Sequence, residues 1–207
     1  MSTKQTEHKE KEQKSEQKQD GGEITDAPAC IKGELCPVCN QKTLELCESE
    51  REIPYFGLLH IFSMNCENPD CNYHKSDIEG EKEENPKKLI FNIESEEDMK
   101  VRVVKSSYAT IKLPHIATVE SMATSNGYVT NIEGILNRIK KQSEILRDTA
   151  EDEEERNKAK NIIKKLQKIM WGQESCKLTI EDESGQSAII SDKTVIEPLK
   201  VSKKKKE

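Results

Sequence analysis

Four cysteines in two close pairs are the residues of this chain best suited to chemistry. Cys36 and Cys39 have two residues between them, and Cys66 and Cys71 have four. Thiolates are soft donors for zinc, and two short turns that each carry a pair can complete a tetrahedron of sulfur ligands. With all four positions filled by protein, no coordination position stays open for a catalytic water. The pattern therefore predicts one structural zinc ion.

Other interpretations of these residues stay open. His74 follows Cys71 at ligand spacing and could take its place in the metal site. The first pair could be a redox motif, although such motifs expect a βαβ context and strand and loop patterns follow here. Disulfides would need export or oxidation. The remaining cysteines are expected to be small buried or surface side chains and not ligands: Cys30, Cys47 and Cys176.

A small β-rich module over residues 30–75 is needed to position the cysteines. Apolar side chains alternate over residues 42–46 and 58–64, which predicts two strands joined by a segment with Pro54 and Gly57. A module of this size buries too little apolar surface to fold alone. Structural zinc contributes about 10–16 kcal/mol to such folding units, so the metal is expected to hold the module together.

The segment Ile53-Pro54-Tyr55-Phe56-Gly57 is rich in aromatic side chains in a chain that has few of them. One interpretation places these side chains in the miniature core of the zinc module. The other makes the segment a loop that presents apolar anchors to a protein partner. Both interpretations remain open at the level of sequence.

The rest of the chain is expected to form a mainly β domain with an inserted helical hairpin. Residues 76–88 are polar and are interpreted as a linker, and the β-domain is predicted over residues 89–199. Within it, apolar residues recur at helical spacing in two stripes, which predicts a hairpin at about 131–171. Residues 177–180 and 188–190 flank a turn and are expected to pair as a β-hairpin. Residues 1–29 are predicted to be a disordered charged tail and residues 200–207 a lysine-rich tail.

Charge argues for a protein partner. The net charge is −6, and the basic C-terminal tail leaves the folded part more acidic still. An acidic body repels phosphate backbones and suits a basic protein. A nucleic-acid-binding zinc ribbon in transcription or RNA handling is the alternative, but residues 34–75 are themselves mostly acidic among their charges.

Several classes of protein find no support in the sequence. No apolar run approaches the ~18 residues that span a bilayer, and the N-terminus lacks the apolar stretch of a signal peptide. The chain is therefore expected to be soluble and cytoplasmic. It has no P-loop, no G-x-G-x-x-G and no H-E-x-x-H motif, so we expect it not to be an enzyme.

Three motifs, in order, resemble the ZPR-type zinc-finger proteins. The first combines the two cysteine pairs with the segment Glu52–Gly57, the second is Arg102–Ile111, and the third is Gly127–Leu136. The resemblance spans roughly residues 33–199. With a single zinc module, the chain looks like the shorter archaeal members.

The resemblance implies a four-cysteine zinc finger followed by a double-stranded β-helix-like domain that carries a helical hairpin. It implies that Cys36, Cys39, Cys66 and Cys71 hold the zinc. It also implies a partner, because eukaryotic relatives bind translation elongation factor one alpha and assist its folding. The sequence departs from the family in its second cysteine pair, which has four intervening residues where the family usually has two.

Overall fold

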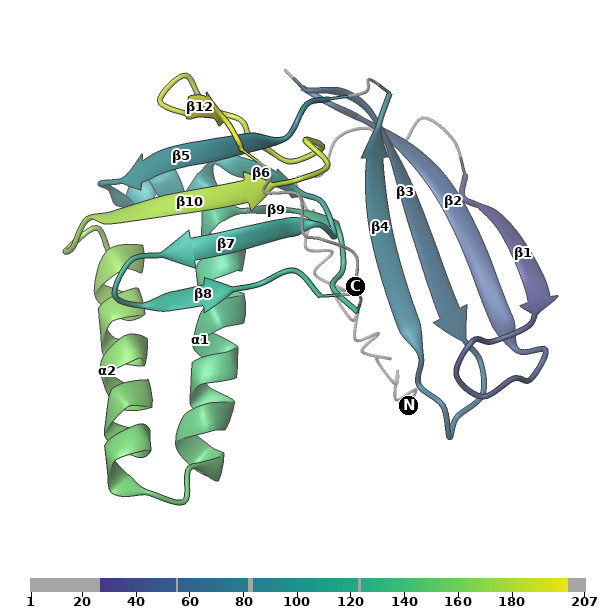
Figure 1. The fold of residues 1–207 in the computed structure, drawn as a ribbon, viewed down its shortest axis with the longest axis horizontal. Coiled ribbons are helices and arrows are strands. Elements are labelled where there is room, and N and C mark those ends of the chain that lie inside the picture. The colour runs from purple at the N-terminus through teal and green to yellow at the C-terminus, as the bar shows by residue number, and fades with distance from the viewer. Residues whose placement is uncertain (1–26, 55, 82–83, 123, 201–207) are drawn as a thin grey trace, which may run out of the picture.

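The computed structural model describes residues 27–200 apart from residues 55, 82, 83 and 123. The described chain forms two β-rich parts and a pair of long helices (Figure 1). The elements are β1 (Ala29–Glu34), β2 (Leu44–Ile53), β3 (Gly57–Cys66), β4 (His74–Gly80), β5 (Lys87–Ile93), a 3-10 turn η1 (Glu96–Lys100), β6 (Arg102–Lys105), β7 (Ala109–Leu113), β8 (Ala117–Val119), β9 (Tyr128–Asn131), α1 (Ile132–Thr149), α2 (Glu153–Met170), β10 (Cys176–Asp182), β11 (Ala188–Ile189) and β12 (Val195–Pro198).

The N-terminal sheet consists of β1 to β4 in sequential order, and all its neighbouring strands are antiparallel. Its longest pair joins β2 to β3 from Leu44 opposite Cys66 to Ile53 opposite Gly57. Gly57 has a φ of 107°, a left-handed conformation that other residues rarely adopt, and this lets the chain turn between the two strands. Because Cys66 lies opposite Leu44, at the other end of this strand pair, the cysteine-bearing loops are at the end of the sheet away from the turn.

The sandwich domain, residues 87–198, contains two further sheets. One has the order β12-β5-β10-β7-β8 and the other the order β11-β6-β9. Between the sheets and the helices lies the main core, in which Phe91, Leu178 and Ile180 are fully buried. Alternate residues of each strand point inward, which explains the buried–intermediate alternation along β7.

Helices α1 and α2 form an antiparallel hairpin whose base belongs to that core. Asn131 caps α1 by accepting a hydrogen bond from the backbone N–H of Gly134 at 2.8 Å, and Asp152 caps α2. Ile135 of α1 and Ile169 of α2 are buried among the sheet residues. Neither helix has the length of apolar sequence that a membrane span requires, within the part of the chain that the structure describes.

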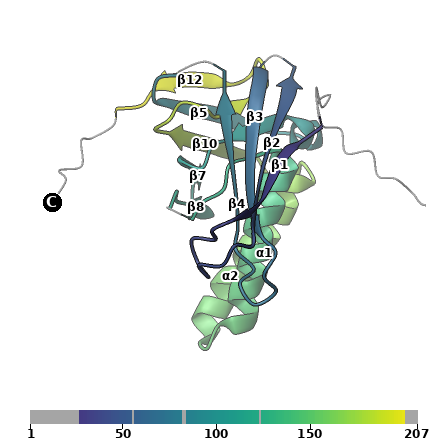
Figure 2. The ribbon, with the colours of Figure 1, turned by 90° about the vertical axis from the view of Figure 1, so that its right-hand side faces the viewer.

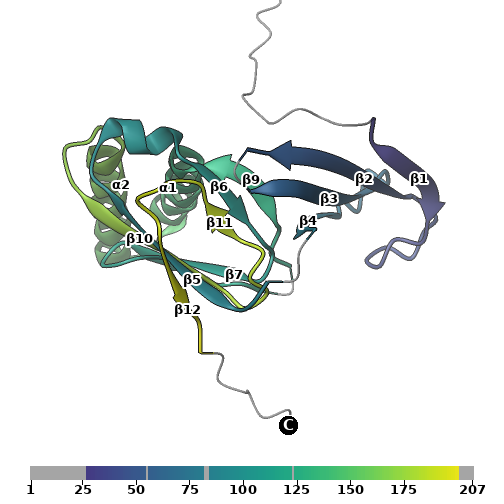
Figure 3. The same cartoon turned by 90° about the horizontal axis from the view of Figure 1, so that it is seen from above.

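The two parts of the molecule meet where β4 runs beside β9 and the residues that lead into it (Figure 3). The backbone N–H of Gly127 donates to the carbonyl of Ser76 at 3.0 Å, and the Ser76 hydroxyl donates back to the carbonyl of Gly127. A Cβ atom at Gly127 would lie 2.7 Å from Oδ1 of Asp77 and 2.9 Å from the backbone nitrogen of Ile78. Glycine is therefore required for this close approach.

The fold corrects three sequence expectations. Both ends of the predicted linker, residues 76–88, belong to strands. Residues 76–80 belong to β4, because their backbone pairs with β3 although their side chains are mostly polar, and residues 87–88 begin β5. The segments 177–180 and 188–190 do not pair with each other: β10 lies between β5 and β7, and β11 pairs with β6 in the other sheet. The helical hairpin lies where the two apolar stripes predicted it. The predicted tails, residues 1–29 and 200–207, lie outside the described residues except for 27–29 and 200, and the first predicted tail is one residue too long because Ala29 belongs to β1.

Candidate metal centre

The four predicted ligands come together at one end of the N-terminal sheet. Their Sγ atoms all lie within 4.8 Å of one another, with 3.7 Å between Cys36 and Cys71 and 3.8 Å between Cys39 and Cys66. A zinc ion about 2.3 Å from each of four sulfurs in a tetrahedron would place the sulfurs about 3.8 Å apart. The donor set and its spacing therefore fit one zinc ion.

Two tight loops hold these sulfurs. In the first, between β1 and β2, the carbonyl of Cys36 accepts from the backbone N–H of Asn40 at 2.9 Å, and Asn40 has a φ of 56°. In the second, between β3 and β4, Asn72 follows the last cysteine with a φ of 50°. Asparagine tolerates this left-handed conformation better than most residues. The four intervening residues of the second pair are thus accommodated by a wider turn.

The turn of the second pair is built by Asn68. Its backbone carbonyl accepts from the N–H of Cys71 at 3.0 Å, and its side-chain oxygen accepts from the N–H of Asp70 at 3.1 Å. A hydrogen bond between an asparagine side chain and a nearby backbone N–H stabilises a turn locally. The longer spacing between Cys66 and Cys71 therefore does not prevent their sulfurs from meeting.

The surroundings of the cluster shift the pKa values of Cys39 and Cys71 in opposite directions. The backbone N–H of Gln41 lowers the pKa of Cys39 to about 6. Burial, together with the neighbouring sulfurs, raises the pKa of Cys71 to about 12. Four negative thiolates this close repel one another, and a divalent cation between them removes that cost. With four cysteine ligands the ion has no open position, so its role at this site would be structural.

The nearby residues support the site without joining it. Cys36 is fully buried, and Leu44 packs against the sulfurs from the start of β2. The Thr43 hydroxyl lies 3.2 Å from Sγ of Cys66, where it can orient that ligand. His74, the alternative ligand, lies outside the cluster, and its Nδ1 atom is 3.4 Å from the carbonyl of Asn72.

The structure adds a disulfide that the sequence did not predict. Cys30 of β1 and Cys47 of β2 lie opposite each other in the sheet, and their sulfurs are bonded at 2.06 Å. The expectation that they are merely small side chains is therefore wrong for this pair. It holds for Cys176, which is a free, half-buried thiol. The missing signal was β1 itself, because only its register with β2 shows that the two cysteines face each other.

The predicted aromatic loop divides between core and surface. Ile53 is buried in a second small core with Leu59, Ile78 and Val104, so its side chain is not accessible to a partner. Phe56 packs against that core, Pro54 and Gly57 are exposed, and Tyr55 lies outside the described residues. Partner binding by this loop stays a prediction for the exposed part of the segment.

A small four-cysteine metal module joined to a two-sheet domain with a helical hairpin defines this chain as a zinc-finger protein with a β-sandwich. The family model of the ZPR1 jelly-roll domain matches residues 97–205. A ZPR1-like protein of Methanocaldococcus jannaschii is 38% identical over 159 residues, which cover 76% of this chain and 79% of that protein. A ZPR1-like protein of Pyrococcus horikoshii is 33% identical over 163 residues, 76% of this chain and 72% of that protein.

Eukaryotic relatives are longer. The protein named zinc finger chaperone zpr1 of Schizosaccharomyces pombe is 28% identical over 147 residues, 66% of this chain but 30% of that protein. The chain belongs to the ZPR1 family. The expected mainly β fold with two helices, a four-cysteine cluster and a jelly-roll domain is confirmed, as is the expectation of a cluster that could bind one zinc ion.

Proposed function

We propose that this chain is a non-enzymatic, zinc-stabilised binding protein that assists the folding of a protein client in the cytoplasm. The proposed client is a translation elongation factor of the one-alpha type. The observation that carries this proposal is a pair of exposed apolar ends, one on the zinc-bearing loops and one on the helical hairpin. Both project from the sandwich domain in the same direction (Figures 1 and 2).

The first apolar end lies beside the metal cluster. Leu35 and Val38, on the loop that carries Cys36, are 58% and 61% exposed. Zinc bound to the adjacent cysteines would keep this loop rigid, so that the two side chains are presented at little cost in conformational entropy. Rigid, exposed apolar side chains are typical anchors for a protein partner.

The second apolar end lies toward the turn of the helical hairpin. The base of the hairpin is buried in the sandwich core, whereas Ile145 and Leu146, near the end of α1, are 47% and 63% exposed. Nothing in the fold of the described residues covers these two side chains. A client that contacts both apolar ends would bind between the cysteine-bearing loops and the turn of the helical hairpin.

The nature of the client is supported more indirectly. The S. pombe relative carries the word chaperone in its name. The elongation factor is what the family resemblance implies. The net charge of −6 suits a basic partner, because opposite charge speeds and orients the encounter.

The test is capture of the purified elongation factor of the same cell by the zinc-loaded chain. Val38→Asp and Leu146→Asp should each weaken capture at least tenfold while leaving zinc content and thermal melting unchanged. Val195→Asp, at an exposed position of β12, is the matched control and should capture normally. A zinc-loaded chain that does not retain the elongation factor at micromolar concentrations would contradict the proposed client.

A further inference from the structure

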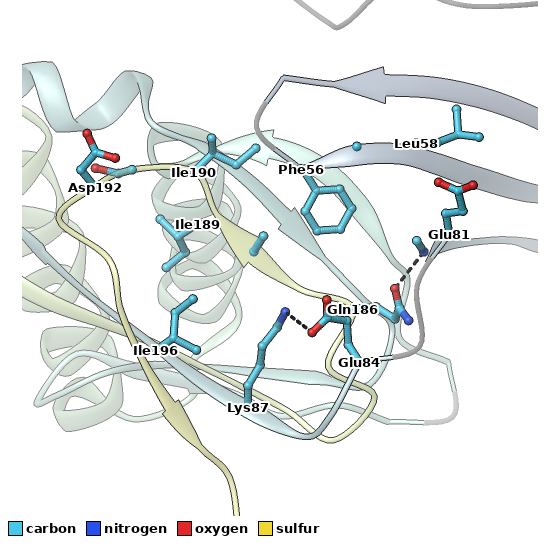
Figure 4. A pocket seen from close by; sticks show the side chains of 14 residues that line it. Phe56, Leu58, Glu81, Glu84, Lys87, Gln186, Ile189, Ile190, Asp192 and Ile196 are labelled. Carbon is cyan, nitrogen blue, oxygen red and sulfur yellow. Dashed lines mark hydrogen bonds and ion pairs between the residues drawn. The ribbon is translucent and has the colours of Figure 1, made fainter.

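A groove of about 770 Å³ lies where the N-terminal sheet meets the sandwich domain (Figure 4). It is separate from both the metal cluster and the hairpin turn. Its walls come from segments far apart in the sequence: the start of β3, the end of β4, the start of β5, and the edge strands β11 and β12. A volume of this size is within the range of about 300–1,000 Å³ found for ligand pockets.

The interior of the groove is apolar. Phe56 and Leu58 line it from the N-terminal sheet, and Ile190 and Ile196 line it from the sandwich domain (Figure 4). Ile196 is 63% exposed. It lies opposite Leu89 in the sheet, and because Leu89 is buried in the core, both side chains are on the inner face of that sheet. The groove thus leaves an inward-facing isoleucine accessible to solvent.

The rim of the groove is acidic. Glu81, Glu84 and Asp192 line it, against one lysine, Lys87. Lys87 and Glu84 form an ion pair at 3.6 Å, so an excess of negative charge remains around the apolar interior. Glu81, Glu84 and Asp192 are exposed to solvent, and their excess negative charge favours a ligand that places positive charge at the rim.

The groove also runs beside two sheet edges. β12 is one edge strand of the five-stranded sheet, and the two-residue β11 is one edge strand of the three-stranded sheet. The carbonyl of Ile189 in β11 already accepts hydrogen bonds from Ser191 and Thr194, so a further strand would pair with β12. Edge strands carry backbone N–H and C=O groups on their outer side that can pair with a further strand. An extended peptide can use such groups for affinity while its side chains enter a neighbouring pocket.

We propose that this groove binds an extended peptide segment of a partner protein in which an apolar side chain is flanked by lysine or arginine. The apolar side chain enters between Phe56 and Ile196, and the flanking basic side chains meet Glu81 and Asp192. The groove accommodates a few side chains, so the partner contributes a linear segment and not a folded surface. This site is additional to the two apolar ends that contact the client, and it does not depend on the identity of that client.

Dye-labelled synthetic peptides test the proposal on the full, zinc-loaded chain. One probe is a hexapeptide of alternating lysine and isoleucine, and its counterpart carries glutamate in place of every lysine. Fluorescence anisotropy should show the basic probe binding at least tenfold more tightly than the acidic one. The affinity for the basic probe should fall several-fold between 50 and 500 mM salt, since screening weakens exposed ion pairs.

Paired variants locate the binding site. Ile196→Asp should weaken binding of the basic probe at least tenfold, whereas Val195→Asp should not, because neighbouring residues of a strand point to opposite faces. Asp192→Lys should weaken the basic probe several-fold and strengthen the acidic one, and Glu120→Lys, at an exposed position outside the groove, should do neither. Capture of the elongation factor by Ile196→Asp should stay normal, which separates this test from that of the proposed function.

Three results would overturn the proposal. Equal affinity for the two probes would exclude recognition by charge, and equal effects of Ile196→Asp and Val195→Asp would exclude the groove as the site. A deletion of residues 201–207 that raises the affinity for the basic probe more than tenfold would show that the chain's own lysine-rich segment occupies the groove, and a partner peptide would then be the wrong occupant.

Discussion

The hydroxyl of Ser107 donates a hydrogen bond to the carboxylate of Asp77 at 2.7 Å, and this contact joins the sandwich domain to β4 of the N-terminal sheet. The backbone N–H of Ser107 donates to the same carboxylate at 3.3 Å. Gly127 also lies close to this aspartate. A few polar residues thus set the direction in which the zinc-bearing loops project relative to the helical hairpin.

Removal of the Ser107 hydroxyl should loosen this junction. Ser107→Ala leaves one oxygen of Asp77 without its donor in a half-buried place, and the loss of a hydrogen bond to a charged group costs about 1–3 kcal/mol. We expect a reduction of that size in the free energy of unfolding, measured with urea. Ser121→Ala, at an exposed position, should change it by less than about 0.5 kcal/mol. Equal values for the two variants would show that the bond does not stabilise the junction.

Asp182 should make stability depend on acidic pH. Its carboxylate is fully buried. Burial alone would raise its pKa, but hydrogen bonds from Ser187, Ser184 and Ser106 outweigh burial, and the pKa lies below its usual value of 3.8. A lowered pKa in the folded state stabilises the protein above the pKa of the unfolded chain, about 3.9, and this stabilisation is lost as the pH falls through the folded-state pKa.

The variant Asp182→Asn isolates that contribution. At pH 7 its free energy of unfolding should be about 1–3 kcal/mol lower than that of the original chain, because a hydrogen-bonded buried charge is lost. The difference should shrink as the pH is lowered below about 4. Trp171, the single tryptophan, lies at the C-terminal end of α2 and is 61% exposed, so its emission reports on the base of the helical hairpin and not on the metal module, and amide exchange of β10 follows the sheet. Glu183→Gln, at the exposed neighbouring position, is the control; a constant difference for Asp182→Asn at all pH values would contradict this interpretation.

The two ends of the hairpin should respond differently to truncation. Ile169 is fully buried at the base, so Ile169→Ala should lower the free energy of unfolding by about 2–5 kcal/mol through lost burial and a cavity. Leu146, near the turn, is 63% exposed, and Leu146→Ala should change the free energy of unfolding by less than about 0.5 kcal/mol. Denaturant titration compares them. A large loss for Leu146→Ala would mean that this end of the hairpin has a structural role and is not free to contact a client.

The metal ligands could be predicted from sequence because zinc requires particular residue types at short spacing. Cys36 and Cys39 already occupy one turn, and only the partner turn had to be found. The helical hairpin could be predicted equally well, since apolar residues at helical spacing mark the helix face that packs against the core. Both features are encoded in short stretches of the chain.

Features that depend on distant segments could not be predicted. All of β1 is exposed, and β4 has Ile78 as its one buried side chain, so neither strand shows an apolar alternation. Because β1 could not be predicted, the sequence did not show that Cys30 and Cys47 lie opposite each other. β10 likewise pairs with β5 and β7, which are distant in the sequence. The turn-forming residues around Gly185 instead predicted a local hairpin. The groove beside Ile196 exists only because such distant segments meet.

The central claim is that four cysteines hold one zinc ion and that this ion orders the N-terminal sheet. Its most direct test combines elemental analysis with amide hydrogen exchange before and after a strong chelator. We expect one zinc per chain, retained in Cys30→Ser and lost in Cys36→Ser. Removal of the metal should abolish protection of the β2 and β3 amides while Trp171 emission stays constant. A chain that purifies without zinc, or one in which β2 and β3 remain protected after the metal is stripped, would contradict the claim.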